Sequence, residues 1–141
     1  MTPDGISDID WARVHELAVE IGNAEGNASH TYTSELLGYL TTLEQKYGPL
    51  PSILTTRADY AGDPRESAAL LTRAYRVAAE RHDREATLYI ASSLAALQIA
   101  EFRDRREGAR WLAAFADALK HAGDEFDRED FQELEIALEA L

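Results

Sequence analysis

The sequence predicts an all-α protein of about seven helices, packed as stacked helical hairpins. Three observations carry this prediction. Apolar residues recur at helical spacing along most of the chain, and no segment alternates apolar and polar residues as a half-buried strand does. One short phrase also occurs in two similar copies, DPRESAALL over residues 63–71 and DRREGARWL over residues 104–112. The chain of 141 residues suits a single helical domain, 1–141.

Residues 1–48 are expected to form the N-terminal helices. Ser7 and Asp10 resemble a capping box, which starts a helix that runs as far as a loop over residues 22–30. That segment, GNAEGNASH, is small and polar. A second helix is expected over about residues 33–47, because Gly48-Pro49 stops it.

Residues 50–123 are expected to form two α-hairpin repeats. The two copies of the doubled phrase lie 41 residues apart, and each begins with an aspartate that can cap a helix, Asp63 and Asp104. A repeating hairpin explains the doubling, because each pair of helices buries its apolar side by stacking on the next pair. The four helices are expected over residues 51–61, 64–82, 83–102 and 105–123.

The last segment, residues 124–141, is expected to be an acidic capping helix that begins near Asp127. Its apolar stripe covers the preceding hairpin, and its other sides carry glutamates and aspartates. The stripe consists of Phe131, Leu134, Leu138 and Leu141. Among the aromatic residues of the chain, Trp11, Trp111, Phe102, Phe115, Phe126 and Phe131 are expected in the core.

The repeated segment resembles the tetratricopeptide repeat family. Ser67, Leu71 and Ala74 follow one another at spacings of four and three, as in the second helix of that family, and Gly108 and Leu112 match in the second copy. The resemblance covers about residues 50–123. It departs from the family in its interval of 41 residues rather than about 34, and in its lack of the family's tryptophan. Another class of α-hairpin repeat and a compact helical bundle therefore remain open as alternatives.

Charge is the strongest compositional signal. The net charge is −12, both ends of the chain are acidic, and the arginines lie in the middle. Such a field repels nucleic acid and anionic membranes, and it accelerates encounter with a basic protein. The chain has no cysteine and no secretory signal, and its longest uncharged stretch, residues 88–100, is too short to span a membrane. These features predict a soluble, cytoplasmic protein that contacts neither nucleic acid nor a membrane.

No catalytic residue, metal ligand or cofactor site is predicted. His15-Glu16 begins a phrase like the zinc motif HExxH, but Val19 stands where the second histidine is required. No segment has the ligand spacing of a calcium loop, and no glycine-rich phosphate loop is present. The central arginines are interleaved with glutamates, so they are expected to form surface ion pairs. The interleaved glutamates are Glu66, Glu80, Glu85, Glu101 and Glu107.

The leading functional hypothesis is a non-enzymatic protein–protein interaction module with a basic protein partner. The tetratricopeptide resemblance implies that the first helix of each pair lines an inner binding surface. That surface would consist of Thr56, Asp59, Tyr60, Tyr89, Ser93, Leu97 and Glu101. A second candidate surface is the acidic helix, through Glu125, Asp127, Glu129, Asp130 and Glu133.

Within this class, a small, acidic, cysteine-free helical protein is similar to the cytoplasmic immunity or antitoxin-type proteins of bacteria, which occlude a toxin or effector. Two alternatives stay open. One is an enzyme with a carboxylate-rich, metal-assisted site, because paired carboxylates cannot be recognised without coordinates. The other is a structural homo-oligomer that pairs through the C-terminal helix.

Overall fold

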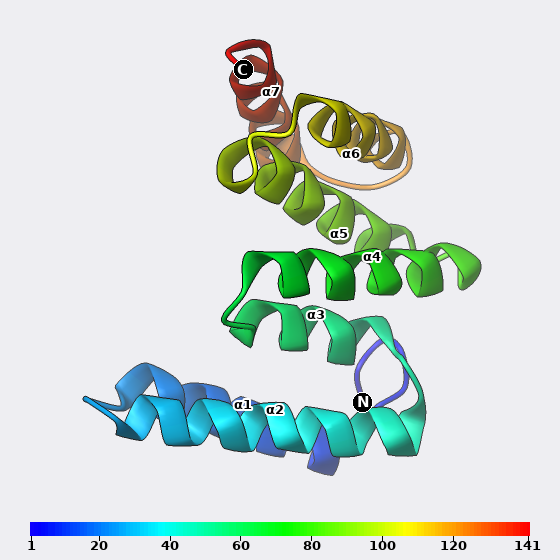
Figure 1. Ribbon diagram of the computed structural model, residues 1–141. Coiled ribbons are helices and arrows are strands. Elements are labelled where there is room, and N and C mark those ends of the chain that lie inside the picture. The colour runs from blue at the N-terminus through cyan, green and yellow to red at the C-terminus, as the bar shows by residue number, and fades with distance from the viewer.

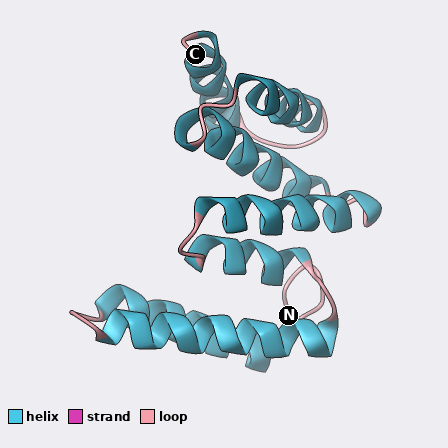
Figure 2. Cartoon of the chain, in the orientation of Figure 1, coloured by secondary structure: helices cyan, strands magenta, loops and turns pink.

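The protein is all-α, as predicted, with seven helices and no strand in a computed structural model that describes residues 1–141 (Figure 2). One helix is continued by a π-helical turn, η1, whose backbone hydrogen bonds span five residues instead of four. The elements are α1 (Asp8–Asn23), α2 (Ala28–Tyr47), α3 (Pro51–Tyr60), α4 (Pro64–Glu80), α5 (Arg84–Ala96), η1 (Leu97–Glu101), α6 (Arg105–Leu119) and α7 (Glu125–Glu139).

The helices pack as sequential hairpins. α1 pairs with α2, α3 with α4, and α5 with α6, while α7 packs against α6 and η1. Successive pairs follow one another along a stack, from α1 and α2 at one end to α7 at the other (Figure 1). This arrangement confirms the predicted stacking of helical pairs.

Most helix starts lie where the capping signals predict them. The side chains of Asp63, Asp83 and Asp104 each accept a hydrogen bond from a backbone N–H in the first turn of the following helix. Ser7 caps α1 in the same way. The second half of a Ser7–Asp10 capping box is not formed, because the backbone N–H of Ser7 donates to the hydroxyl of Tyr47 instead.

Four boundaries differ from the prediction. α2 begins at Ala28 rather than near residue 33, because residues 28–30 of the predicted loop are helical; its cap residue, Asn27, makes no side-chain hydrogen bond. α7 begins at Glu125 rather than near Asp127, after a complete capping box. α4 and α6 end two to four residues early, before left-handed residues that close their last turns. These residues are His82 and Gly123, with φ of 55° and 93°.

Close contacts between the two helices of a pair recur after 41 residues, the interval of the doubled phrase. In the α3–α4 pair, Ser67 Oγ donates a hydrogen bond of 2.8 Å to the carbonyl oxygen of Ala58. The residues 41 positions later are Gly108 and Ile99, and they lie close together where α6 packs against η1. A Cβ atom on Gly108 would lie 2.8 Å from Ile99 Cγ1. Small residues at equivalent positions therefore let the two helices of each pair approach closely.

The helix junctions also recur at this interval. His82 and Gly123 are both left-handed, and each is followed by an aspartate, Asp83 or Asp124, that caps the next helix. In both junctions the aspartate side chain accepts from the backbone N–H three residues later. α7 therefore occupies the position of α5 in the repeat.

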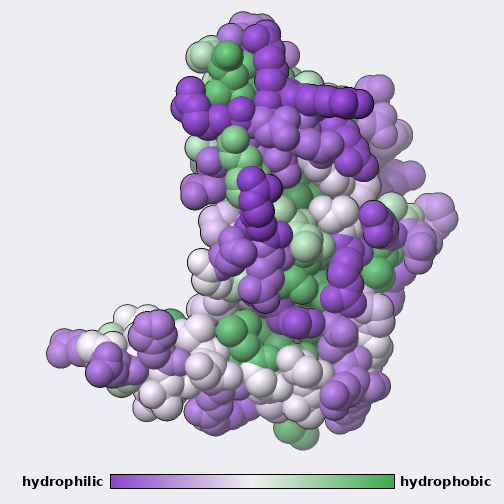
Figure 3. Space-filling model, in the orientation of Figure 1, coloured by the Kyte–Doolittle hydropathy of each residue, from purple (hydrophilic) through white to green (hydrophobic).

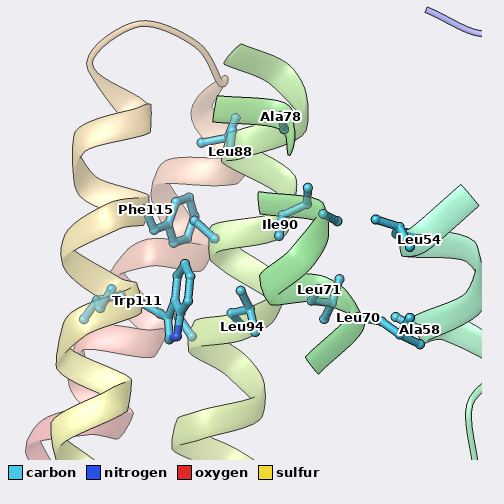
Figure 4. Packing of buried hydrophobic residues seen from close by; sticks show 14 of the residues in the cluster. Leu54, Ala58, Leu70, Leu71, Ala78, Leu88, Ile90, Leu94, Trp111 and Phe115 are labelled. Atoms are coloured by element: carbon cyan, nitrogen blue, oxygen red, sulfur yellow. The ribbon is translucent and has the colours of Figure 1, made fainter. Parts of the chain in front are cut away.

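The apolar interior forms two clusters that meet at α3. The smaller cluster joins the N-terminal segment, α1, α2 and Ile53, and the larger one extends from Leu54 and Ala58 through α4, α5 and α6 (Figure 4). Phe115 is fully buried in the larger cluster, where its ring meets the edge of Phe131 at 5.5 Å between centroids. A single short helix thus couples the two halves of the core.

The cap of α3 comes from a distant part of the chain. Leu50 stands at the cap position and has no side-chain acceptor. Asp4 takes its place, accepting from the backbone N–H of Ser52 at 2.7 Å and from the Ser52 hydroxyl at 2.8 Å. Thr2 donates a further hydrogen bond of 2.7 Å to the same carboxylate. The N-terminal segment is thereby fastened to the start of α3.

Asp10 is expected to make folding depend on pH. Hydrogen bonds from Lys46, at 2.8 Å, and from Tyr47 hold the pKa of Asp10 below its ordinary value. The stability that this carboxylate contributes is therefore complete above the unfolded-state pKa of about 3.9, and it is lost as the pH falls through the lower folded-state value. We expect Asp10→Asn to reduce the free energy of unfolding at neutral pH and to flatten its decline between about pH 4 and pH 2.

Urea unfolding at a series of pH values measures this difference. Glu20→Gln on the same helix is the control, because Glu20 is exposed and forms no ion pair. A variant curve parallel to that of the unchanged protein over the acidic range would contradict the role assigned to Asp10.

Candidate functional site

The seven residues predicted on the first helices of the pairs fall on α3, α5 and η1, and they divide by exposure. Asp59, Tyr89 and Glu101 are exposed. The hydroxyls of Thr56 and Ser93 donate to carbonyl oxygens of their own helices, at 2.7 and 3.0 Å. The other two, Tyr60 and Leu97, pack against the smaller and the larger apolar cluster.

Asp59 and Tyr89 lie close together, although 30 positions separate them in the sequence. Burial raises the pKa of Tyr89, and the nearby Asp59 carboxylate raises it further. Partial burial raises the pKa of Asp59 as well. The predicted face of α3 and α5 therefore has an acidic and aromatic centre.

A hollow of about 240 Å³ lies beside this centre, between the N-terminal ends of α3 and α5. Tyr89 and Thr55 line it, together with Asp4 from the N-terminal segment. The sequence did not indicate this contribution of Asp4, because only the three-dimensional packing brings it to α3. Two of the acidic groups here, Asp4 and Asp83, are already used as helix caps.

The five acidic residues predicted on the C-terminal helix all lie on α7. None of them forms an ion pair. Glu125, Glu129 and Glu133 are exposed, whereas Asp127 and Asp130 are half-buried. Asp127 Oδ2 accepts from the backbone N–H of Asp124 at 3.0 Å, so its carboxylate completes the capping box. Glu125, Glu129 and Glu133 are therefore the residues available to a partner.

Two large apolar side chains share the outward face of α7. Phe126 is 76% exposed and Ile136 is 68% exposed. At helical spacing they lie on one stripe with Glu129 and Glu133. The expectation that Phe126 belongs to the core is wrong, because the capping box at Asp124 places this residue on the first turn facing away from α6.

The repeat explains why this face is open. On α5 and its continuation η1, the stripe formed by Leu88, Ala95 and Ile99 is buried, and Ile99 packs against Gly108 of α6. The corresponding residues of α7, 41 positions later, are Glu129, Ile136 and Ala140, and all three are exposed. The outward face of α7 thus corresponds to the face on which α5 receives the next helix.

The central arginines form fewer ion pairs with the interleaved glutamates than the sequence predicts. Of the five interleaved glutamates, only Glu107 forms an ion pair, at 3.3 Å from Arg110. The others lie on helix faces or at junctions where no arginine comes within ion-pair distance. Arg76 and Arg84 consequently remain unpaired.

No three histidine or acidic side chains are grouped closely enough to hold a metal ion. None of the helices combines the length and apolar character needed to cross a membrane. Comparisons of the chain with protein-family models, with curated proteins and with solved structures found no match.

Proposed function

We propose that this chain is a non-enzymatic protein–protein interaction module that binds a basic amphipathic helix of a partner on the outward face of α7. The observation that carries the proposal is the correspondence between α5 and α7. A partner helix would take the place on α7 that α6 takes on α5. Phe126 and Ile136 supply the apolar contact, while Glu129 and Glu133 select basic residues around it.

The paired stack supports a tetratricopeptide-like architecture for the module. Ser67 and Gly108 make equivalent close approaches within their pairs, as small residues do in that family. Phe115, at a position where the family has a small residue, is accommodated by the packing of α7 against α6. We place the protein among immunity or antitoxin-type proteins, in which the bound partner is a basic toxin or effector.

A basic partner fits this face better than a second copy of the chain. Two α7 helices paired about a twofold axis would bring Glu129 and Glu133 of one copy against the same carboxylates of the other. Like charges in such an interface repel, and α7 carries no basic side chain on this stripe to offset them.

Charge reversal on α7 is expected to weaken partner capture. We expect Glu129→Lys with Glu133→Lys to slow association roughly tenfold or more at low salt and to flatten its salt dependence, because steering by the acidic face is removed. The measurement is affinity capture from a lysate of the source organism, followed by the association rate of the captured basic partner. Both residues are exposed, so the fold should be retained.

Glu20→Lys with Glu25→Lys is the matched control, because it changes the net charge equally on exposed residues of α1 and the following loop. The control protein should keep the partner. Equal capture by both variants would overturn the assignment to α7. A carboxylate-rich enzyme would instead show specific stabilisation by Mg²⁺, Mn²⁺ or Ca²⁺ in a thermal shift, and a homo-oligomer would show a multiple of the monomer mass in light scattering.

A further inference from the structure

A second surface lies on the side of the stack formed by α4 and α6. A hollow of about 300 Å³ is bounded by Arg76 on α4 and Arg110 on α6. A smaller one, of about 110 Å³, continues it toward Arg84 at the start of α5. Tyr75 and Ala114 line both hollows, so the two adjoin, and together they are called the α4–α6 groove.

The α4–α6 groove is basic in a protein of net charge −12. Arg76 and Arg84 are exposed and form no ion pair, and Arg110 has only an exposed pair with Glu107. Asp117 is the one carboxylate among the lining residues, and Lys120 pairs with it at 3.5 Å. The groove therefore offers several cationic groups with little internal compensation.

Trp111 supplies the second observation. It forms part of the wall of the larger hollow, and although the residue is only 5% exposed, its indole N–H makes no hydrogen bond within the protein and is open to solvent. The indole nitrogen lies at the end of the ring system remote from Phe115 (Figure 4). An indole N–H that is open to solvent can donate to a carboxylate bound in the hollow. The Arg110 guanidinium lies beside it, 5.0 Å from the ring centroid.

We propose that the α4–α6 groove binds an acidic peptide segment, with a carboxylate accepting hydrogen bonds from Trp111 and its neighbouring arginines. This site is separate from α7 and takes a ligand of the opposite charge. The groove follows α6 from about residue 110 to residue 121, which is about 16 Å of helix, the length of roughly five extended residues.

The overall negative charge does not prevent this binding. At physiological salt the Debye length is about 8 Å, so the arginines that touch the ligand outweigh more distant carboxylates. The same overall charge disfavours nucleic acid, whose phosphates extend far beyond a groove of this length. Figure 3 shows one face of the molecule, on which hydrophilic residues surround several apolar areas in the middle of the stack.

Fluorescence of Trp111 tests the proposal directly. In a Trp11→Phe background Trp111 is the only tryptophan, and titration with hexaglutamate peptide should change its emission with a saturable curve. We expect Arg76→Glu with Arg84→Glu to weaken the binding roughly tenfold or more, because two charge-assisted contacts become repulsive. Hexalysine should produce no response.

Arg105→Glu with Arg106→Glu is the matched control, since both arginines are exposed, unpaired and outside the groove. It should leave hexaglutamate binding within about twofold. Equal weakening by both pairs of substitutions would overturn the site, as would a response to oligothymidylate in place of hexaglutamate. The protein could also self-associate and fail to bind hexaglutamate. If Arg76→Glu with Arg84→Glu abolished that self-association, the groove would be assigned to a second copy, and the peptide proposal would be overturned.

Discussion

Replacing Asp4 with alanine is expected to lower the free energy of unfolding by about 2–4 kcal/mol. The residue is only 7% exposed, and its carboxylate accepts hydrogen bonds from the Thr2 hydroxyl and from both the backbone and the hydroxyl of Ser52. Alanine would leave these donors without a partner and would remove the cap of α3. Urea unfolding followed by circular dichroism measures the loss.

The matched control is Asp63→Ala. Asp63 caps α4 with one hydrogen bond of 3.0 Å, but it is exposed and directly precedes the helix that it caps. Its loss should cost about 1 kcal/mol. Asp4→Asn, which keeps one acceptor oxygen, should fall between the two. An Asp4→Ala effect no larger than that of Asp63→Ala would show that the N-terminal segment does not contribute to the stability of α3.

The contrast between these two caps explains how far the sequence predicts the fold. Asp63, Asp83 and Asp104 lie next to the helices that they cap, so local spacing is sufficient to place those helices. Asp4 caps α3 from 48 positions away in the sequence, and no residue near the start of α3 indicates this. The start of α2 differs from the prediction because small, polar residues 28–30 are typical of a loop, although here they form its first turn.

The repeat was predictable because its signals are local and doubled. The phrase beginning at Asp63 recurs at Asp104, and the contacts of Ser67 and Gly108 recur with it. The same interval also relates α5 to α7, and in the sequence it is visible only in the match of Asp83 with Asp124. The helices themselves differ in character, since Leu88 is replaced by Glu129, and the left-handed junctions before the two aspartates establish the equivalence.

The candidate surfaces were predicted in part. The tetratricopeptide resemblance implied that Asp59 and Tyr89 share one surface, and the structure brings them together. Exposure of Phe126 was missed, because an aromatic residue beside an apolar stripe is usually buried. The unpaired state of Arg76 was missed as well, since interleaving of opposite charges in sequence does not ensure that the side chains meet in space.

Phe115→Ala is expected to have the largest effect on the interior, a loss of about 3–5 kcal/mol in the free energy of unfolding. Phe115 is the largest fully buried side chain, and its ring packs edge-on against Phe131 of α7. Truncation leaves a cavity between α6 and α7 and removes one of the contacts that hold the last helix. Phe126→Ala removes the same side chain from an exposed position of α7, so it should change stability by no more than about 0.5 kcal/mol.

The same variant also tests whether the two apolar clusters fold together. Trp11 packs against the smaller cluster and Trp111 lies within the larger one, while α3 contributes buried residues to both. If α3 couples them, a cavity at Phe115 should lower the unfolding midpoint seen by both tryptophans equally, in a single transition that coincides with the loss of helical circular dichroism. A Trp11 transition that stays at its original midpoint would show that α1 and α2 fold independently of the rest of the stack.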